Sequence, residues 1–225
     1  MKFVVSRRAF TLIELLVTIG IIAALCVLLF GVASRTRMSM QSTKCISNQR
    51  QIVAGCLLYA ADNDNRLPPF GNSSNYDFAR SWVYLVSKYL NILPDHLVSV
   101  TAYRCPRADA GAFNSYAVNY GWLGNTPFGY ENDFGSRRVS DIPASAMLCA
   151  DGAPGGYIYA PFIYPLNASD SEAYLSGKMP DASYNYMNFR HDGRSFCGRA
   201  DGSVIPITVK EWVDNAGNIW GKPQD

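Results

Sequence analysis

The chain opens with a long apolar stretch that is followed by a polar region with helical periodicity. Between Phe10 and Phe30 the only charged side chain is Glu14. A run of about 20 apolar residues is long enough to cross a bilayer as a helix. Three basic residues precede this run, Lys2, Arg7 and Arg8. Because positive flanks stay cytoplasmic, the pattern predicts a transmembrane helix over residues 10–30 with a cytoplasmic N-terminus and an exported remainder.

Helical periodicity continues beyond the apolar run, from Gly31 to about Asp62, with no proline to interrupt it. Apolar residues recur at spacings of seven, seven, four and three, which places them in one narrow stripe on a helix: Met38, Cys45, Ile52, Cys56 and Tyr59. We therefore expect residues 31–62 to extend the helix as a stem that packs on the exported domain. Gly31 should soften the helix locally, because glycine costs a helix about 1 kcal/mol.

The remaining residues, 63–225, have the pattern of a globular α+β domain. The Asp- and Asn-rich turn before Pro68 and Pro69 ends the stem, and residues 78–90 show the spacing of an amphipathic helix whose aromatic side chains belong to the core. Four segments have the pattern of strands or of hairpin arms, residues 115–121, 145–150, 195–199 and 204–209. This order predicts a long N-terminal helix packed on an antiparallel sheet.

Residues 152–187 are rich in Gly, Pro and Tyr and have little periodicity. A loop of this length is unusual in a compact domain and is often functional. We interpret it as an insertion on the subunit surface. Its tyrosines could contact another subunit or a ligand, or could pack within the loop itself.

Composition supports a folded, exported domain. Hydrophobic residues make up 48% of the chain and aromatic residues 13%, which suits a real core. Removal of the three basic residues at the N-terminus changes the formal charge from +2 to −1. The basic excess therefore orients the protein in the membrane, and no nucleic-acid partner is expected.

The cysteines leave two readings open. One of the six, Cys26, lies in the span, and five lie beyond it: Cys45, Cys56, Cys105, Cys149 and Cys197. Export permits disulfides, so Cys45 or Cys56 could be bonded to the domain, although both could equally be buried thiols. With no C-x-x-C spacing and only two histidines, no metal site and no cofactor are predicted.

The segment Ala9-Phe10-Thr11-Leu12-Ile13-Glu14-Leu15-Leu16 resembles the cleavage and methylation motif of type IV prepilins and type II secretion pseudopilins. The resemblance implies that residues 1–9 are a leader, that a prepilin peptidase cuts between Ala9 and Phe10, and that the new amine of Phe10 is methylated. Ala9 stands where Gly is usual in this family.

Glu14 is the informative residue of the span. A carboxylate within a membrane is costly and usually marks function. In the family this residue is thought to neutralise the Phe amine of a neighbouring subunit during assembly. The resemblance also implies an inner-membrane location, an assembly platform in that membrane, and oligomers with copies of the chain or with sister pilins.

A second motif lies near the C-terminus, where nine residues separate His191 from Asp201-Gly202. This spacing resembles the H-X9-DG signature of one branch of large prepilin-like proteins, although Ser203 stands where relatives often have His. Over residues 191–202 we expect a hairpin-like element in which His191 and Asp201 hydrogen-bond to backbone. His191, Asp192 and Asp201 could be imagined as acid–base groups, but no nucleophile context accompanies them, and no enzyme activity is predicted.

These observations together predict a structural subunit of a type IV pilus or a type II secretion filament. The alternative is a membrane-anchored exported binding protein that uses the helix only as a tether. Sheared filaments that contain the mature chain would favour the subunit, whereas retention in the membrane would favour the tether.

Overall fold

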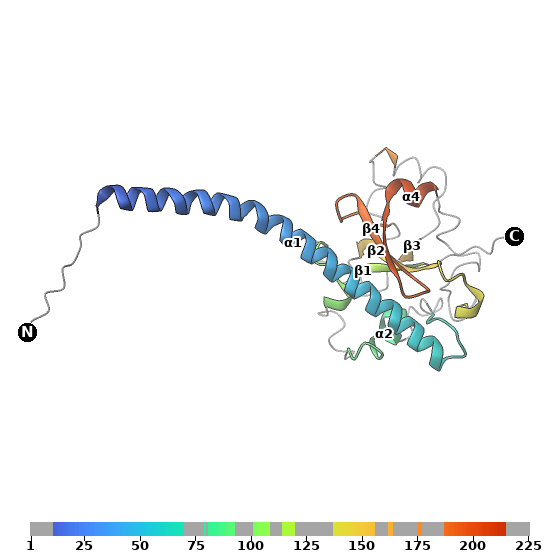
Figure 1. The fold of residues 1–225 in the computed structure, drawn as a ribbon. Coiled ribbons are helices and arrows are strands. Elements are labelled where there is room, and N and C mark those ends of the chain that lie inside the picture. Colours follow the sequence, from blue (N-terminus) through green and yellow to red (C-terminus); the bar gives the residue numbers. More distant parts are fainter. Residues whose placement is uncertain are drawn as a thin grey trace, which may run out of the picture. The chain divides into compact units, whose positions relative to one another are not determined.

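The structure, a computed structural model, describes residues 11–69, 79, 81–92, 101–108, 114–119, 137–155, 162–163, 175–176 and 187–214. The chain forms two compact units, residues 1–40 and residues 41–225. The first is helical where it is described, and the second contains the sheet (Figure 1). The predicted leader, including Ala9 and Phe10, lies outside the described residues.

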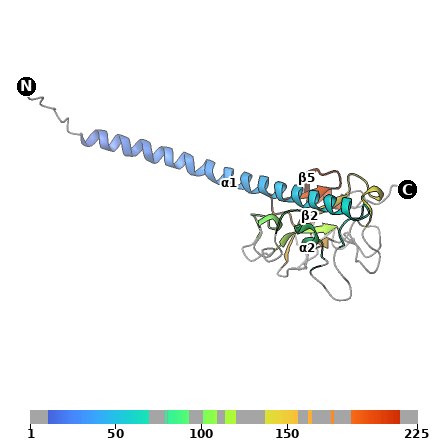
Figure 2. The ribbon, with the colours of Figure 1, turned by 90° about the horizontal axis from the view of Figure 1, so that it is seen from below.

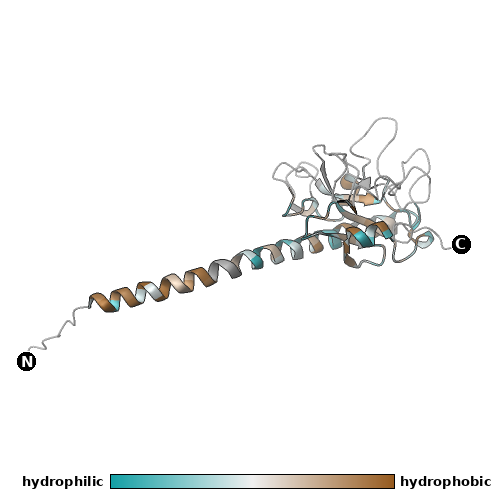
Figure 3. Cartoon of the chain, turned by 90° about the horizontal axis from the view of Figure 1, so that it is seen from above, coloured by the Kyte–Doolittle hydropathy of each residue, from teal (hydrophilic) through white to brown (hydrophobic). Residues whose placement is uncertain are grey.

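Helix α1 spans Leu12–Asp62 and confirms that one helix continues from the apolar run into the polar region. Its first half is mostly apolar (Figure 3), and the large side chains from Leu12 (81% exposed) to Leu28 (70%) lie open to the surroundings. α1 is long and apolar enough to cross a membrane. The backbone is helical through Gly31, so the expected softening there stays a prediction.

The end of α1 follows from its Asn- and Asp-rich sequence. Asp64 and Asn65 adopt left-handed φ values of 51° and 60°, a conformation that Asp and Asn tolerate better than most residues. The N–H of Asn65 donates to the carbonyl of Ala60 at 2.9 Å, and the amide of Asn63 donates to the carbonyl of Tyr59 at 2.8 Å. These bonds satisfy carbonyls of the last helical turn. The chain then leaves the helix and continues to Leu67.

The second unit is built on a five-stranded sheet. Its strands are β1 (Asn114–Asn119), β2 (Met147–Gly155), β3 (Phe162–Ile163), β4 (Arg194–Arg199) and β5 (Val204–Thr208). The order is β3-β1-β2-β4-β5, with four antiparallel strands and β3 added parallel to β1. The predicted α+β class with an antiparallel sheet is confirmed. The two-residue strand β3 was not foreseen.

Helices cover both faces of this sheet (Figures 1 and 2). On one face the second half of α1 packs in a cluster that includes Val53, Cys56, Tyr116, Val118 and Phe196. On the other face Trp212 of α4 (Val209–Asp214) is fully buried in a second cluster with Ala117, Met147, Cys197 and Ile207. Because successive side chains of a strand point to opposite faces of the sheet, the strands contribute side chains to two separate cores.

An irregularity in β2 decides which of its side chains face α1. The register with β4 shifts between Met147 and Cys149, as a bulge does when it adds one residue to a strand. Leu148 and Cys149 both belong to the cluster under α1, whereas Ala150 belongs to the opposite one. The next residue, Asp151, therefore returns to the α1 side of the sheet.

Helix α2 covers Trp82–Ser87 only, so the helix predicted over 78–90 was too long. The Ser81 hydroxyl accepts the N–H of Tyr84 at 3.4 Å and starts the helix. Asn91, with φ of 55°, closes the following turns. Trp82 is fully buried, which agrees with a core role. Phe78 lies outside the described residues.

Two short 3-10 helices, η3 (Thr101–Tyr103) and η4 (Val139–Asp141), complete the described elements. The predicted loop over 152–187 begins later than expected, because β2 continues to Gly155 and Gly152 pairs with Met187. Most of the predicted insertion lies outside the described residues.

Gly198 of β4 tests the packing of α1 on the sheet. A Cβ there would lie 2.7 Å from Cγ2 of Val53 and 2.9 Å from Sγ of Cys149. We therefore expect Gly198→Ala to lower the free energy of unfolding by about 1–3 kcal/mol, as overpacked cores do. Chemical denaturation of the full chain in detergent measures this. Val53→Ala provides the partner for a double-mutant cycle. The double variant should lose less stability than the two single losses added together, and strict additivity would contradict this packing.

Candidate functional site

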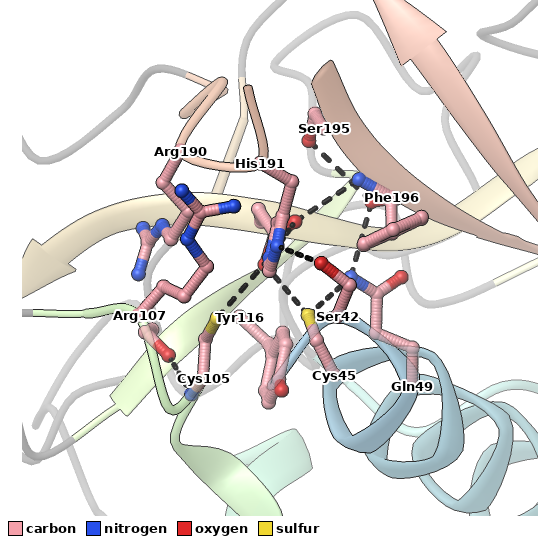
Figure 4. A network of polar contacts seen from close by, with 12 residues as sticks. Ser42, Cys45, Gln49, Cys105, Arg107, Tyr116, Arg190, His191, Ser195 and Phe196 are labelled. Atoms are coloured by element: carbon pink, nitrogen blue, oxygen red, sulfur yellow. Dashed lines mark hydrogen bonds and ion pairs between the residues drawn. The ribbon is translucent and has the colours of Figure 1, made fainter. Parts of the chain in front are cut away.

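A group of four buried, chemically reactive side chains lies between α1 and the sheet. Its members are Cys45 of α1, Cys105 after η3, Asp151 of β2 and His191 before β4, and we call it the Cys/His/Asp cluster. One ligand-type atom of each residue lies within 4.8 Å of the others, and all four residues are buried. In Figure 4 the labelled side chains of Cys45, Cys105 and His191 point toward one another.

The contacts within the cluster converge on one ring nitrogen. Nε2 of His191 lies 3.2 Å from Sγ of Cys105 and 3.5 Å from Oδ2 of Asp151. Sγ of Cys45 donates to Oδ1 of Asp151 at 3.2 Å. One sulfur and one carboxylate oxygen thus contact the Nε2 edge of the imidazole, and the second sulfur contacts the other carboxylate oxygen.

Neighbouring groups hold these side chains in place. The Ser42 hydroxyl lies 3.2 Å from Nδ1 of His191, on the ring edge that faces away from the cluster. The backbone N–H of Phe196 donates to Oδ2 of Asp151 at 3.0 Å. The centroid of the Phe196 ring lies 4.6 Å from the centroid of the imidazole. Gln49 donates to the Phe196 carbonyl at 3.1 Å. The orientation of the imidazole is therefore determined from both edges and from one face.

The turn that carries His191 is shaped by its own sequence. Asp192 and Gly193 have φ values of 54° and 77°, and His191 and Arg194 exchange backbone hydrogen bonds of 3.0 and 3.1 Å. Arg107, which is not part of the turn, pairs with both carboxylate oxygens of Asp192 at 3.0 and 3.2 Å. Arg107 lies two residues after Cys105, so this ion pair links the two segments that supply a thiol and the imidazole.

Burial and mutual contact shift the acidities in the cluster. Desolvation raises the pKa of Asp151 to about 6, helped by the charge of Cys105 and opposed by Arg190 and His191. The hydrogen bond from Cys45 lowers the pKa of Cys105 to about 4, and His191 acts in the same direction. Burial raises the pKa of the Cys45 thiol, as does its bond to Cys105. Among the thiols of the cluster, negative charge is thus favoured on Cys105.

The geometry does not match a nucleophilic triad. In such a triad the nucleophile contacts one imidazole nitrogen, and the carboxylate orients the ring through the other. Here Cys105 and Asp151 both face Nε2, and Nδ1 faces Ser42. All four cluster residues are also buried. The arrangement brings four ligand-type atoms within 4.8 Å of one another.

The two ends of the predicted H-X9-DG motif lie in different environments. Asp201 is exposed, and its Oδ1 accepts the N–H of Ser203 at 2.8 Å in the turn that also contains Gly202, with φ of 83°. This is a backbone bond of the expected kind. The His191 ring contacts side chains of the cluster rather than hairpin backbone, which differs from the expected role. Asp192 is at the surface, in its pair with Arg107.

The cysteines are free in the structure, and Cys45, Cys56, Cys105, Cys149 and Cys197 are all buried. Sequence reasoning placed Cys45 correctly on the buried stripe of α1 but did not connect it to Cys105 or His191. Asp151 was not singled out, because it comes directly after the strand predicted over residues 145–150, whereas β2 continues through it and buries it. The four residues are spread over 147 positions, so no short motif could reveal the cluster.

At the other end of α1, Glu14 has a local partner. Its Oε2 accepts the N–H of Thr11 at 2.9 Å and the Thr11 hydroxyl at 2.8 Å, while the Glu14 N–H donates to the same hydroxyl at 3.3 Å. Thr11-x-x-Glu14 is therefore a capping box, a motif that satisfies N–H groups at a helix start. The sequence contained this signal, but only the membrane position of Glu14 was considered.

Comparison with known proteins bears on this N-terminal region. A family model described as the prokaryotic N-terminal methylation motif matches residues 5–30. No curated protein and no solved structure gives a match. The motif and the apolar helix support a type IV pilin-like or pseudopilin-like precursor that is anchored in the membrane. They imply processing by prepilin peptidase and assembly into oligomers, and they suggest a structural subunit rather than an enzyme.

The contrast between His191 and Asp201 gives a direct test. His191→Ala removes a buried ring together with its contacts to Asp151 and Cys105, so we expect it to lower the free energy of unfolding by about 2–4 kcal/mol. Asp201→Ala affects only an exposed turn and should have a much smaller effect. Denaturation of the two variants side by side measures this. Equal losses would show that the motif acts as one hairpin unit and not through the cluster.

Proposed function

We propose that the mature chain is a structural subunit of a type IV pilus or of a type II secretion filament. The observation that carries this proposal is the methylation motif at residues 5–30 on a helix whose apolar side chains are exposed from Leu12 to Leu28. Such a helix requires lipid before assembly and requires other apolar helices after extraction from the membrane.

The apolar surface of this helix suits both membrane insertion and assembly. Apolar side chains occur all around the first half of α1 rather than on one stripe. A helix that is apolar on every side is suited to lipid or to the centre of a helical assembly. The same surface can therefore serve in the bilayer and in a filament core, with no change of fold.

Glu14 supports the choice of a filament over a tether. A tether has no need of a carboxylate within its span, and such groups are expensive in lipid. In the proposed filament, Glu14 pairs with the methylated amine of Phe10 in a neighbouring subunit. The pair sets the axial register, because a shifted register would leave both charges unpaired in apolar surroundings.

Processing is tested by the N-terminus of the isolated protein. We expect the mature chain to begin with methylated Phe10, and we expect Ala9→Leu to block the cut because a larger side chain replaces a small one at the cleavage site. Mass spectrometry of the N-terminal peptide measures both. Ala9→Gly is the matched control and should be processed at least as well as the parent chain. A native chain that retains residues 1–9 would contradict the proposal.

Assembly is tested by Glu14→Gln. Gln can still accept the hydrogen bonds of a capping box, so the helix start is preserved while the charge is lost. We expect a chain that is inserted and processed but absent from sheared filaments. Thr18→Ala is the matched control. Thr18 is a polar residue one turn further along whose hydroxyl donates only to the carbonyl of Leu15.

The two variants separate the possible roles of Glu14. Filaments at the parental level from Glu14→Gln would show that the carboxylate serves only as a cap. Retention of the parent chain wholly in the membrane, with no copies in filaments, would instead favour the tether.

A further inference from the structure

We propose that the Cys/His/Asp cluster binds one divalent transition-metal ion of the zinc type, with Cys45, Cys105, Asp151 and His191 as ligands. The proposal does not depend on the filament function, because all four residues lie in the unit that contains the sheet. It assigns a structural role to a group of side chains that the fold otherwise buries at a cost.

The distances are close to those of a tetrahedral site. Zinc bonds of about 2.0–2.3 Å place neighbouring ligand atoms about 3.3–3.8 Å apart. The distances here are 3.2 Å for Cys105 Sγ to His191 Nε2, 3.5 Å for His191 Nε2 to Asp151 Oδ2, and 3.2 Å for Cys45 Sγ to Asp151 Oδ1. All four ligand atoms lie within 4.8 Å of one another, so side-chain rotations that move them by up to about 1 Å would bring them to tetrahedral spacing.

The donor set selects the metal. Two thiolates and an imidazole suit zinc and exclude calcium and magnesium, which prefer oxygen ligands. Four protein ligands in a closed, buried environment are typical of structural zinc rather than of catalytic zinc, which keeps one position open. A structural ion therefore fits the burial of all four residues.

The surroundings provide what metal ligands need. A ligating histidine usually donates its other ring N–H to an oxygen, and the Ser42 hydroxyl lies 3.2 Å from Nδ1 of His191. The Phe196 N–H holds Oδ2 of Asp151, and a backbone hydrogen bond from Arg107 favours the thiolate of Cys105. Three of the four ligands thus have a support outside the cluster.

Charge is also balanced in the bound state. Two thiolates, one carboxylate, a neutral imidazole and a dication leave one negative charge, and the protons that the thiols still carry go to solvent on binding. Arg190 interacts favourably with the Asp151 carboxylate and donates to the carbonyl of Gly152. Its positive charge compensates the remaining negative charge.

The test uses the full chain in detergent, purified without a metal-affinity step. We expect about one zinc ion per chain by elemental mass spectrometry, as for a structural site. A chelator should lower Tm, because a metal bound only by the folded state stabilises it. Cobalt(II) loading should give the charge-transfer absorption of thiolate ligands. Cys45→Ser and Cys105→Ser should each lose the stoichiometric zinc and the chelator effect.

Cys56→Ser is the matched control. Cys56 is equally buried and lies on the same helix, but it is outside the cluster, so its zinc content should equal that of the parent. Three results would overturn the proposal: a parent chain that takes up no zinc or cobalt, zinc retained by both cluster variants, or a native Cys45–Cys105 disulfide detected by peptide mapping. Cobalt spectra of the parent chain do not depend on the folding of any variant.

Discussion

The burial of one face of α1 against the sheet is the constraint on which the second unit depends. The buried residues of this face follow helical spacing: Cys45, Asn48, Gln49, Ile52, Val53, Cys56 and Ala60. Toward the C-terminal end of α1 this face is apolar and packs against Val118, Leu148 and Phe196. Around Asn48 and Gln49 the face is polar, and hydrogen bonds hold it to the second unit. The Asn48 amide, for example, donates to the Tyr116 hydroxyl at 3.2 Å. Apolar burial supplies the attraction, and the polar bonds fix the position of the helix on the strands.

A single helix thus meets two environments. Its first half has apolar side chains exposed from Leu12 to Leu28, whereas the second half has one buried face and one charged, exposed face. The change is visible in the colours of α1 in Figure 3. No proline or break is needed between the halves, because helical backbone satisfies its own hydrogen bonds in lipid and in water alike. The side chains differ between the two halves, whereas the backbone stays helical throughout.

The sequence predicts this helix, its turn and the β4–β5 hairpin, because each depends on local periodicity or on turn residues such as Asp201-Gly202. It predicts α2 too long, since spacing alone cannot show where Ser81 begins the capped turn. Asn48 and Gln49 were missed for a different reason: an apolar stripe is found by looking for apolar residues, and these two are polar and buried. The cluster was missed because its members come from four segments that are far apart in the sequence, and because Asp151 returns to the α1 side through the register shift in β2.

The position of the cluster follows from the same register. Cys45 is the first buried residue of α1 among those whose burial is described, so the cluster lies where the packing of the helix begins. At that end of the interface the buried face of α1 is partly polar, since the side chains of Asn48 and Gln49 are fully buried there. Ligands or hydrogen-bond partners from α1, from the Cys105 segment, from β2 and from the His191 turn converge there. These contacts tie α1 to three other segments of the second unit at the point where the buried face of the helix begins.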